Sequence, residues 1–269
     1  MSNHYDHIKI KVALEDFDIR YNHPHDVTAI LETFILNVYR TELLKKGDTV
    51  LDLGAGIGEF SCLASKKVGL NGRVIAIETS PDDFETLQKN LKENLCDNVS
   101  PLNVAVTNFN GELQLKFKGK TFKTMCKPLQ DILKEEKVDK INFCKIDIEG
   151  GERMVIPENA SIFNDIHYLS MEIHDGYQDE LIPLMSQLGF GFEKITKRNY
   201  AKNALKFAFR HPIKMYELLN LLKKAGEYPG VTKILKGIDI EKSSNLMIGT
   251  FFKRNVKMDT FSKVGDEKN

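Results

Sequence analysis

The stretch that decides the fold is Val50-Leu51-Asp52-Leu53-Gly54-Ala55-Gly56-Ile57-Gly58-Glu59-Phe60. An apolar run leads into a glycine-rich turn, and the turn opens into a segment with helical periodicity. In such a unit, backbone N–H groups and the positive end of the helix dipole face an anionic or polar ligand. The glycines allow positive φ angles and let the main chain approach the ligand without a Cβ atom in between. The pattern therefore predicts a ligand-binding loop at the end of a buried strand.

A second apolar run, Val74-Ile75-Ala76-Ile77, follows the loop and ends in Glu78. An acidic residue about 20 residues after such a loop can accept hydrogen bonds from both hydroxyls of a ribose. Strand, loop, helix, second strand and acid therefore stand in the order that a nucleoside-binding unit requires. The sequence predicts a nucleoside-containing cofactor.

The spacing of the glycines indicates which cofactor. A dinucleotide fingerprint reads G-x-G-x-x-G, and its third glycine lets the helix pack closely on the strand. Here the glycines stand at 54, 56 and 58, and Glu59 takes the third place. We expect Glu59 at the mouth of the loop, where its charge would repel a pyrophosphate and disfavour a dehydrogenase. Asp52 instead suits a ligand with an ammonium and a sulfonium group. This D-x-G-x-G-x-G pattern resembles the first motif of class I S-adenosylmethionine-dependent methyltransferases, and Glu78 then matches their ribose-binding acid.

Length and composition bound the class of protein. The chain has 269 residues, enough for one large α/β domain or two small ones. It has 38 Lys and Arg and 38 Asp and Glu residues, so its net charge says nothing about nucleic acid. No apolar run approaches the ~20 residues of a membrane helix, and the N-terminus has no signal-peptide core. The four cysteines lack C-x-x-C spacing, which favours free thiols in a reducing cytoplasm over a zinc site.

Strand-like apolar runs alternate with helical patterns along the chain. This alternation predicts an α/β fold with a mostly parallel, seven-stranded sheet that is covered by helices on both faces. We expect an N-terminal extension over 1–25, one domain over 26–258 and a flexible tail over 259–269. The strands are expected near 50–53, 74–77, 99–106, 141–147, 168–174, 190–196 and 246–252.

A basic insert, about 198–244, separates the last two expected strands. From Lys197 to Lys236 the chain has ten Lys and Arg residues against two acidic residues. Two helical runs are expected within it, at 201–209 and 213–225. One interpretation is an insert that docks on the core by an apolar stripe, with its lysines in water. The other is a basic amphipathic cap that selects an anionic or lipid-like substrate and makes peripheral membrane contact.

Two other strand ends hold polar side chains. In Lys145-Ile146-Asp147-Ile148-Glu149-Gly150-Gly151-Glu152, the strand period places the first, third and fifth residues on one side. In Met171-Glu172-Ile173-His174, the acid and the histidine share a side in the same way. Ligands of open α/β sheets bind at the carboxyl ends of the strands, where the glycine loop and Glu78 also lie. Four segments therefore converge on one edge, which predicts an active site.

Together with Asn103-Val104-Ala105-Val106, these motifs resemble the FkbM family, whose most specific element is the K-I-D-x-E-G-x-E block. The family comprises class I methyltransferases of Rossmann-like fold that mostly O-methylate sugars, polyketides and other small molecules. The resemblance implies that Asn103 to Ala105 border the adenine and that Asp147 lies beside the methionine moiety or the acceptor. One departure is Gly56-Ile57, where many relatives have Asn before the last glycine, and the basic insert has no counterpart. The implied cofactor-binding residues are Asp52, Gly54, Ala55, Gly56, Gly58, Glu78, Thr79, Asn103, Val104, Ala105 and Asp147.

Three alternatives remain for the chemistry at Asp147, Glu149, Glu172 and His174. Methyl transfer to a hydroxyl requires a positioned acceptor and a group that takes its proton. His174 is the natural base near neutral pH, and Asp147 or Glu149 could serve if packing raises its pKa. In the third alternative Asp147, Glu149 and Glu172 hold Mg²⁺, which lowers the pKa of a vicinal diol. His174 could instead be a structural partner of Glu172 or Asp175, and Glu149 and Glu152 could simply favour a helix N-terminus.

The expected function is O-methylation of a small-molecule, sugar or lipid-linked acceptor, with S-adenosylmethionine as the cofactor. The rivals are a nucleic-acid or protein methyltransferase and a catalytically silent cofactor-binding module. A nucleic-acid substrate is disfavoured because Asp147-Ile148-Glu149-Gly150 stands where base-amino methyltransferases have an N/D-P-P-Y/F motif. The intact strand-end carboxylates speak against the silent module. The sequence leaves the acceptor, the metal and the oligomeric state open.

Overall fold

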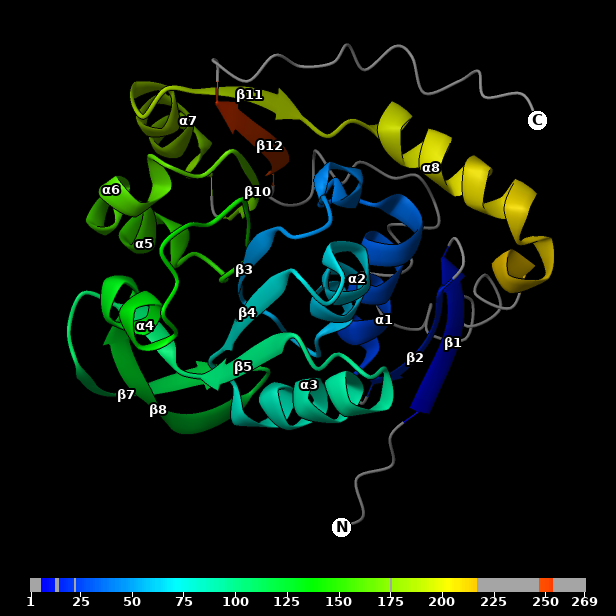
Figure 1. The fold of residues 1–269 in the computed structure, drawn as a ribbon, viewed down its shortest axis with the longest axis horizontal. Coiled ribbons are helices and arrows are strands. Elements are labelled where there is room, and N and C mark those ends of the chain that lie inside the picture. Colours follow the sequence, from blue (N-terminus) through cyan, green and yellow to red (C-terminus); the bar gives the residue numbers. More distant parts are fainter. Residues whose placement is uncertain (1–5, 13–14, 22, 175, 217–246, 254–269) are drawn as a thin grey trace.

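The computed structural model describes residues 6–12, 15–21, 23–174, 176–216 and 247–253. At its centre is a seven-stranded sheet with the order β11-β12-β10-β9-β3-β4-β5 (Figure 1). The strands are β3 (Thr49–Leu53), β4 (Arg73–Glu78), β5 (Val99–Asn103), β9 (Phe143–Ile146), β10 (Tyr168–Ile173), β11 (Phe190–Lys194) and β12 (Met247–Lys253).

The sheet is parallel from β5 to β10, and β12 runs antiparallel to both of its neighbours. The chain first winds outward from β3 to β4 and β5, and then returns to place β9 on the other side of β3. The strand order therefore reverses between β3 and β9, and such a switch point opens a crevice at the carboxyl ends of the strands. The predicted Rossmann-like α/β fold is confirmed.

Helices cover both faces of the sheet because successive strand residues point to opposite sides. Leu51 and Leu53 belong to a core cluster with residues of α4 to α7, whereas Val50 packs on the other face against α2. Ala76 of β4 faces α1 to α3. The helices are α1 (Pro24–Leu31), α2 (Glu59–Val68), α3 (Pro81–Glu93), α4 (Leu129–Glu135), α5 (Glu152–Glu158), α6 (Ala160–Phe163), α7 (Gln178–Gln187) and α8 (Lys197–Arg210).

The strand expected over 99–106 is divided in the structure. β5 ends at Asn103, and β6 (Ala105–Thr107) instead joins β7 (Gly111–Phe117) and β8 (Lys120–Pro128) in a separate three-stranded sheet. The side-chain amide of Asn103 donates to the carbonyl oxygens of Glu78 (2.8 Å) and Thr79 (3.2 Å), which ties the end of β5 to the end of β4. The expectation of one continuous strand is wrong because the chain changes sheets at Val104.

The N-terminal segment forms a hairpin that packs on the domain. β1 (Asp6–Val12) and β2 (Glu15–Tyr21) pair antiparallel, and Ile10 and Phe17 are buried against α1 to α3. α1 continues into a π-helical turn, η1 (Glu32–Leu36), and a 3₁₀ turn, η2 (Thr41–Leu43). The extension over 1–25 and the boundary at 26 stay predictions of domain organisation.

Asn90 of α3 and Asn94, which caps the C-terminal end of α3, fix this hairpin. Asn90 accepts from the Arg20 N–H (2.8 Å) and donates to the carbonyl oxygens of Arg20 (3.1 Å) and Ile57 (2.8 Å). One turn later, Asn94 accepts from the Asp18 N–H and donates to the Asp18 carbonyl, both at 2.9 Å. The amides thus replace the strand partner that the edge strand β2 would otherwise lack.

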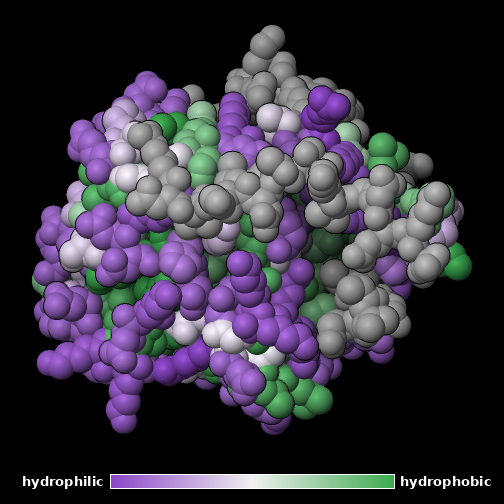
Figure 2. All heavy atoms as spheres, turned by 45° about the horizontal axis from the view of Figure 1, so that its top comes forward, coloured by the Kyte–Doolittle hydropathy of each residue, from purple (hydrophilic) through white to green (hydrophobic). Residues whose placement is uncertain are grey.

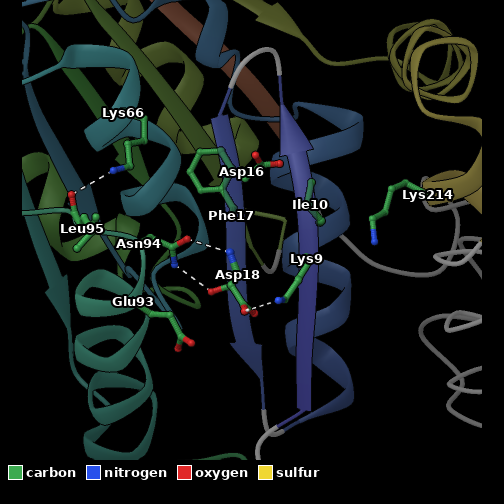
Figure 3. A pocket seen from close by; sticks show the side chains of 10 residues that line it. All are labelled: Lys9, Ile10, Asp16, Phe17, Asp18, Lys66, Glu93, Asn94, Leu95 and Lys214. Carbon is green, nitrogen blue, oxygen red and sulfur yellow. Dashed lines mark hydrogen bonds and ion pairs between the residues drawn. The ribbon is translucent and has the colours of Figure 1, made fainter.

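A pocket of about 380 Å³ lies beside this junction (Figure 3). It is lined from the hairpin, from the C-terminal ends of α2 and α3, and by Lys214, and so lies away from the carboxyl edge of the sheet. Its lining mixes both signs of charge: Lys9, Ile10, Asp16, Phe17, Asp18, Lys66, Glu93, Asn94, Leu95 and Lys214.

Of the basic insert, the structure describes α8 and a second helical segment at 212–216. α8 begins with a capping box between Thr196 and Asn199, and its Asn203 side chain donates to the Leu36 carbonyl (2.7 Å). The rest of the expected helix over 213–225 and the tail over 259–269 lie outside the described residues. No helix of the described part combines the length and the apolar character that crossing a bilayer requires.

We expect Asn90→Ala to lower the free energy of unfolding by about 2–3 kcal/mol, because it leaves buried backbone groups of Arg20 and Ile57 without partners. The control is Asn110→Ala, which removes an exposed hydrogen bond to Asp131 and should change stability by less than about 0.5 kcal/mol. Urea unfolding of both variants provides the measurement. Equal stabilities would contradict the role of Asn90 in anchoring the hairpin.

Candidate active site

The glycine loop follows β3 and folds over the end of β4. The N–H groups of Gly54 and Ala55 both donate to the Ile77 carbonyl, at 3.0 and 2.9 Å. Gly54, Gly56 and Gly58 have φ angles of +78°, +54° and +86°, which glycine adopts without strain. The loop therefore has the conformation that the glycine pattern predicts.

The first two glycines serve different purposes. A Cβ on Gly54 would lie 1.7 Å from the carbonyl oxygen of Asp147, so this glycine lets the loop touch the end of β9. A Cβ on Gly56 would meet nothing nearer than a carboxylate oxygen of Glu59 at 4.0 Å. Gly56 thus borders open space, where a ligand can approach the main chain.

A buried ion pair supports the loop from below. Lys145 Nζ donates to the Gly54 carbonyl (2.5 Å) and lies 3.3 Å from Asp52 Oδ1 and 3.8 Å from Asp147 Oδ2. The hydroxyl of Ser61 donates to the other oxygen of Asp52 (2.6 Å). Burial alone would lower the pKa of Lys145, but Asp52, Asp147 and Glu59 raise it above its ordinary value. The ammonium therefore stays charged, and Asp52, which has no exposed surface, acts on the loop through Lys145.

Glu59 is not at an exposed mouth of the loop, contrary to expectation. It begins α2, is only 4% exposed, and lies 3.5 Å from the hydroxyl of Thr33. Burial raises the pKa of its carboxyl to about 7. The explanation that Glu59 repels a pyrophosphate at the mouth is therefore wrong, and the missing third glycine remains the argument against a dinucleotide.

The expected ribose and adenine residues gather beside the loop. The carboxylate of Glu78 accepts from the N–H groups of Gly56 (2.8 Å) and Ser80 (2.7 Å), and burial raises its pKa to about 7. Thr79 donates to the Val104 carbonyl (3.4 Å), next to the amide of Asn103. Ala105 follows as the first residue of β6. The ends of β4 and β5 thus form one continuous wall next to Gly56.

The strand-end acids and His174 form a second cluster. Nδ1 of His174 lies 3.1 Å from the buried carboxylate of Glu152, which also accepts from the Ile148 N–H (3.1 Å). Nε2 faces the other way, 3.6 Å from Glu149, 3.6 Å from Glu172 and 3.9 Å from Asp147. The convergence of these strand ends was expected, and so was Glu172 as a partner of His174. Glu152 is an additional partner that the sequence did not indicate, and Asp175 lies outside the described residues.

Burial and the neighbouring charges change the pKa of His174 in opposite directions. Burial by itself would lower the pKa of the imidazole, but the hydrogen bond to Glu152 and the charges of Asp147, Glu152 and Glu149 raise it. Glu149 also adopts φ +53°, which is uncommon for a non-glycine residue and is often found at functional sites.

Three further residues belong to the site although sequence reasoning missed them. The Tyr39 hydroxyl donates to Asp147 (2.8 Å) and lies 3.5 Å from Glu172. Burial, together with the charges of Asp147 and Glu59, raises the pKa of Glu32 to about 8. Tyr200 of α8 packs against the cluster that contains Tyr39, and its pKa is raised by burial and then by the charges of Glu32 and Glu172. Only Glu32 gave a signal, as an acid within an apolar helical run.

The cluster also has the composition of a metal site. Asp147, Glu149 and His174 each offer a ligand atom, and these atoms lie within 4.8 Å of one another. Carboxylate oxygens suit Mg²⁺, and imidazole nitrogen suits transition metals. Glu152 fixes the histidine ring through Nδ1, as partners of metal-bound histidines do. These residues thus fit a divalent cation, and Glu172 lies close enough to add a further oxygen.

The region that contains this site matches a known family model. The family model described as "Methyltransferase FkbM domain" matches residues 52–192, more than half of the chain. The hexuronic acid methyltransferase AglP of Haloferax volcanii is 26% identical over 173 residues, which cover 59% of this chain and 69% of that protein. The ribosomal RNA large subunit methyltransferase E of Nitratidesulfovibrio vulgaris is 35% identical over 80 residues, which cover 25% of this chain and 39% of that protein.

Among solved structures, an rRNA methylase from Streptococcus thermophilus aligns with a TM-score of 0.47 at 10% identity. The alignment covers 82% of this chain and 95% of that one.

We expect Gly56→Ala and Gly54→Ala to fail in different ways. The Cβ of Gly56→Ala enters open space, so stability should fall by only about 1–2 kcal/mol, while the affinity for S-adenosylhomocysteine falls at least about tenfold. Gly54→Ala collides with the Asp147 backbone and should destabilise the fold by more than about 3 kcal/mol. Calorimetric titration and thermal unfolding separate the two effects. Wild-type affinity in Gly56→Ala would remove the loop from the cofactor site.

We expect the affinity for S-adenosylhomocysteine to fall with decreasing pH. If Glu78 binds the ribose as expected, its carboxylate is the form that accepts both hydroxyls, and its pKa is raised to about 7 in the free protein. The affinity should therefore fall about tenfold between about pH 8 and pH 6. Glu78→Gln should bind more weakly and without this dependence. The same pH dependence in both proteins would assign it to another group.

Proposed function

The chain belongs to the FkbM methyltransferase family, and on this premise we propose that it methylates a hydroxyl oxygen of a sugar or a similar polyhydroxylated small molecule. It is an S-adenosylmethionine-dependent methyltransferase. The observation that carries the proposal is the orientation of His174, whose Nε2 faces three carboxylates beside the glycine loop.

The residues around the loop fit the cofactor. When bound, S-adenosylmethionine supplies a methyl group on an electrophilic sulfonium. The open side of Gly56 gives the main chain access to the ligand, and Glu78 lies within reach of the same space. Asp147 joins the two halves of the site, because its backbone touches Gly54 and its carboxylate belongs to the His174 cluster.

His174 has the geometry of a general base. The buried carboxylate of Glu152 accepts a hydrogen bond from Nδ1–H of His174, which leaves Nε2 as the nitrogen that can take a proton from an acceptor hydroxyl. Asp147 and Glu149 are alternative bases, and Asp147 already accepts a hydrogen bond from the Tyr39 hydroxyl. A metal bound at Nε2 would occupy the same lone pair, so His174 cannot be base and ligand at once.

The acceptor side of the site is rich in carboxyl groups. Asp147, Glu149, Glu172 and Glu32 surround it, and Lys145 is the nearest cation below the loop. Carboxylates accept hydrogen bonds from sugar hydroxyls, and a protonated Glu32, with a pKa of about 8, can also donate. These carboxylates would repel an anionic group of the acceptor placed beside the base. The similarity to a hexuronic acid methyltransferase supports a sugar acceptor, whose hydroxyl would face the base and whose carboxylate would point away.

We expect methyl transfer to glucuronoside and glucoside acceptors to give an ether. A methyl ether withstands mild alkali, whereas a methyl ester of a uronic carboxylate is hydrolysed. Methyl-labelled S-adenosylmethionine, followed by alkali treatment and mass spectrometry, distinguishes the two products. An alkali-labile product, or labelling of added RNA but not of glycosides, would overturn the proposal.

We expect His174→Ala to lower kcat by at least about 100-fold, because general base catalysis contributes that much or more. The affinity for S-adenosylhomocysteine should stay within about twofold, since His174 lies on the acceptor side. His167→Ala, at an exposed position before β10, is the matched control and should keep wild-type turnover. Unchanged turnover in His174→Ala would transfer the role of base to Asp147 or Glu149.

If His174 is the base, dialysis against EDTA should leave turnover within about twofold of the untreated enzyme. Loss of turnover that Mg²⁺ or Mn²⁺ restores would instead assign Asp147, Glu149 and Glu172 to a metal. Asp147→Asn, assayed in parallel, tests whether Asp147 is a metal ligand, because that variant would then need more metal for half-maximal rate.

A further inference from the structure

The outward face of α8 exposes large apolar side chains. Leu205 is 71% exposed and Phe209, one turn later, is 90% exposed. Beyond the helix end at His211, Ile213 and Tyr216 are 74% and 67% exposed. Figure 2 shows green apolar side chains among purple ones at the right-hand edge, where α8 lies in Figure 1. Folding of the domain does not bury this face.

The inward face of the same helix already anchors it to the domain. Phe207 is buried, and Ala204 packs against the same cluster. Asn203 donates to the Leu36 carbonyl, and Tyr200 packs against the cluster that contains Val38 and Tyr39. Because α8 is held from this side, the exposed apolar residues on its other side are available for a second contact.

Cations surround the exposed apolar residues. Arg198, Lys202, Lys206 and Arg210 are exposed, and none makes an ion pair in the part of the chain that the structure describes. From Lys197 to Tyr216 the sequence has six Lys and Arg residues and no Asp or Glu. Long basic side chains can keep their charges at lipid headgroups while apolar neighbours enter the acyl boundary.

We propose that the outward face of α8, continued by Ile213 and Tyr216, binds the surface of an anionic lipid bilayer. The charge of this segment complements anionic headgroups, and its apolar side chains supply the buried area that electrostatics alone would lack. The helix lies in the interface and does not cross it, in keeping with the absence of a membrane-crossing helix from the described residues.

The same helix would bring the membrane close to the active site. Tyr200 lies on the opposite side of α8 from Leu205 and Phe209 and packs against the apolar cluster that contains Tyr39. The hydroxyl of Tyr39 in turn donates to Asp147. A protein bound through α8 could thus reach a sugar that is carried on a lipid. This link to the acceptor rests on the proposed function, whereas membrane binding itself does not.

The test is flotation of the full chain with vesicles of phosphatidylcholine alone or mixed with phosphatidylglycerol. We expect binding to the mixed vesicles, weakened by salt. Lys202→Gln/Lys206→Gln should lower the partition coefficient about fivefold per removed charge. Leu205→Ser/Phe209→Ser should lower it at least about tenfold. Leu70→Ser, which removes a side chain that is 91% exposed after α2, is the matched control and should bind like the wild type.

Titration with S-adenosylhomocysteine shows that each variant is folded and tests the cofactor site separately, since flotation needs neither cofactor nor acceptor. Equal binding to neutral and anionic vesicles would overturn the proposal, as would wild-type binding by the Leu205→Ser/Phe209→Ser variant. A dimer in sedimentation equilibrium that this variant abolishes, without vesicle binding by the wild type, would assign the face to a second copy of the chain.

Discussion

The buried ammonium of Lys145 is the interaction on which the site depends. It connects the Gly54 carbonyl, Asp52 and Asp147, so it holds the glycine loop, the end of β3 and the end of β9 in one arrangement. Removing one member of such a buried pair typically costs about 3–5 kcal/mol, because the remaining charge has no compensation. The glycine loop and the acidic residue at the end of β9 are therefore held together by one charge.

Lys145 only partly compensates the negative charge of the carboxylates in the site. Asp147, Glu149 and Glu172 lie around Nε2 of His174, and carboxylates at such distances repel one another. Three groups can relieve the repulsion: a protonated His174, a proton on Glu172, whose pKa burial raises, or a divalent cation. An acceptor hydroxyl offers a hydrogen-bond donor to the same oxygens. The fold thus supplies a site that favours hydrogen-bond donors and cations and repels anions close to His174.

The sequence predicted the parts of the site that follow from strand ends and glycine spacing. The loop, Glu78, Asp147 and His174 come together because parallel strands end at one edge. It could not predict Tyr39, which lies between the π-helical turn η1 and the 3₁₀ turn η2, and it indicated Glu32 only as an acid within an apolar helical run. It also misplaced Glu59, because a motif gives the position of a residue along the chain and not whether its carboxyl faces solvent or Thr33.

For the basic insert, too, the sequence predicted the charge but not where each side chain lies. Its excess of Lys and Arg was visible in the sequence. The sequence did not show, however, which apolar residues of the helix face the domain and which face solvent. In the structure Phe207 faces the domain and Phe209 faces solvent, only two residues away. Apolar side chains on both sides of α8 mean that one side packs on the domain and the other is exposed. On one side Tyr200 packs against the cluster that contains Tyr39 of the acidic site, and on the other side exposed cations surround Phe209.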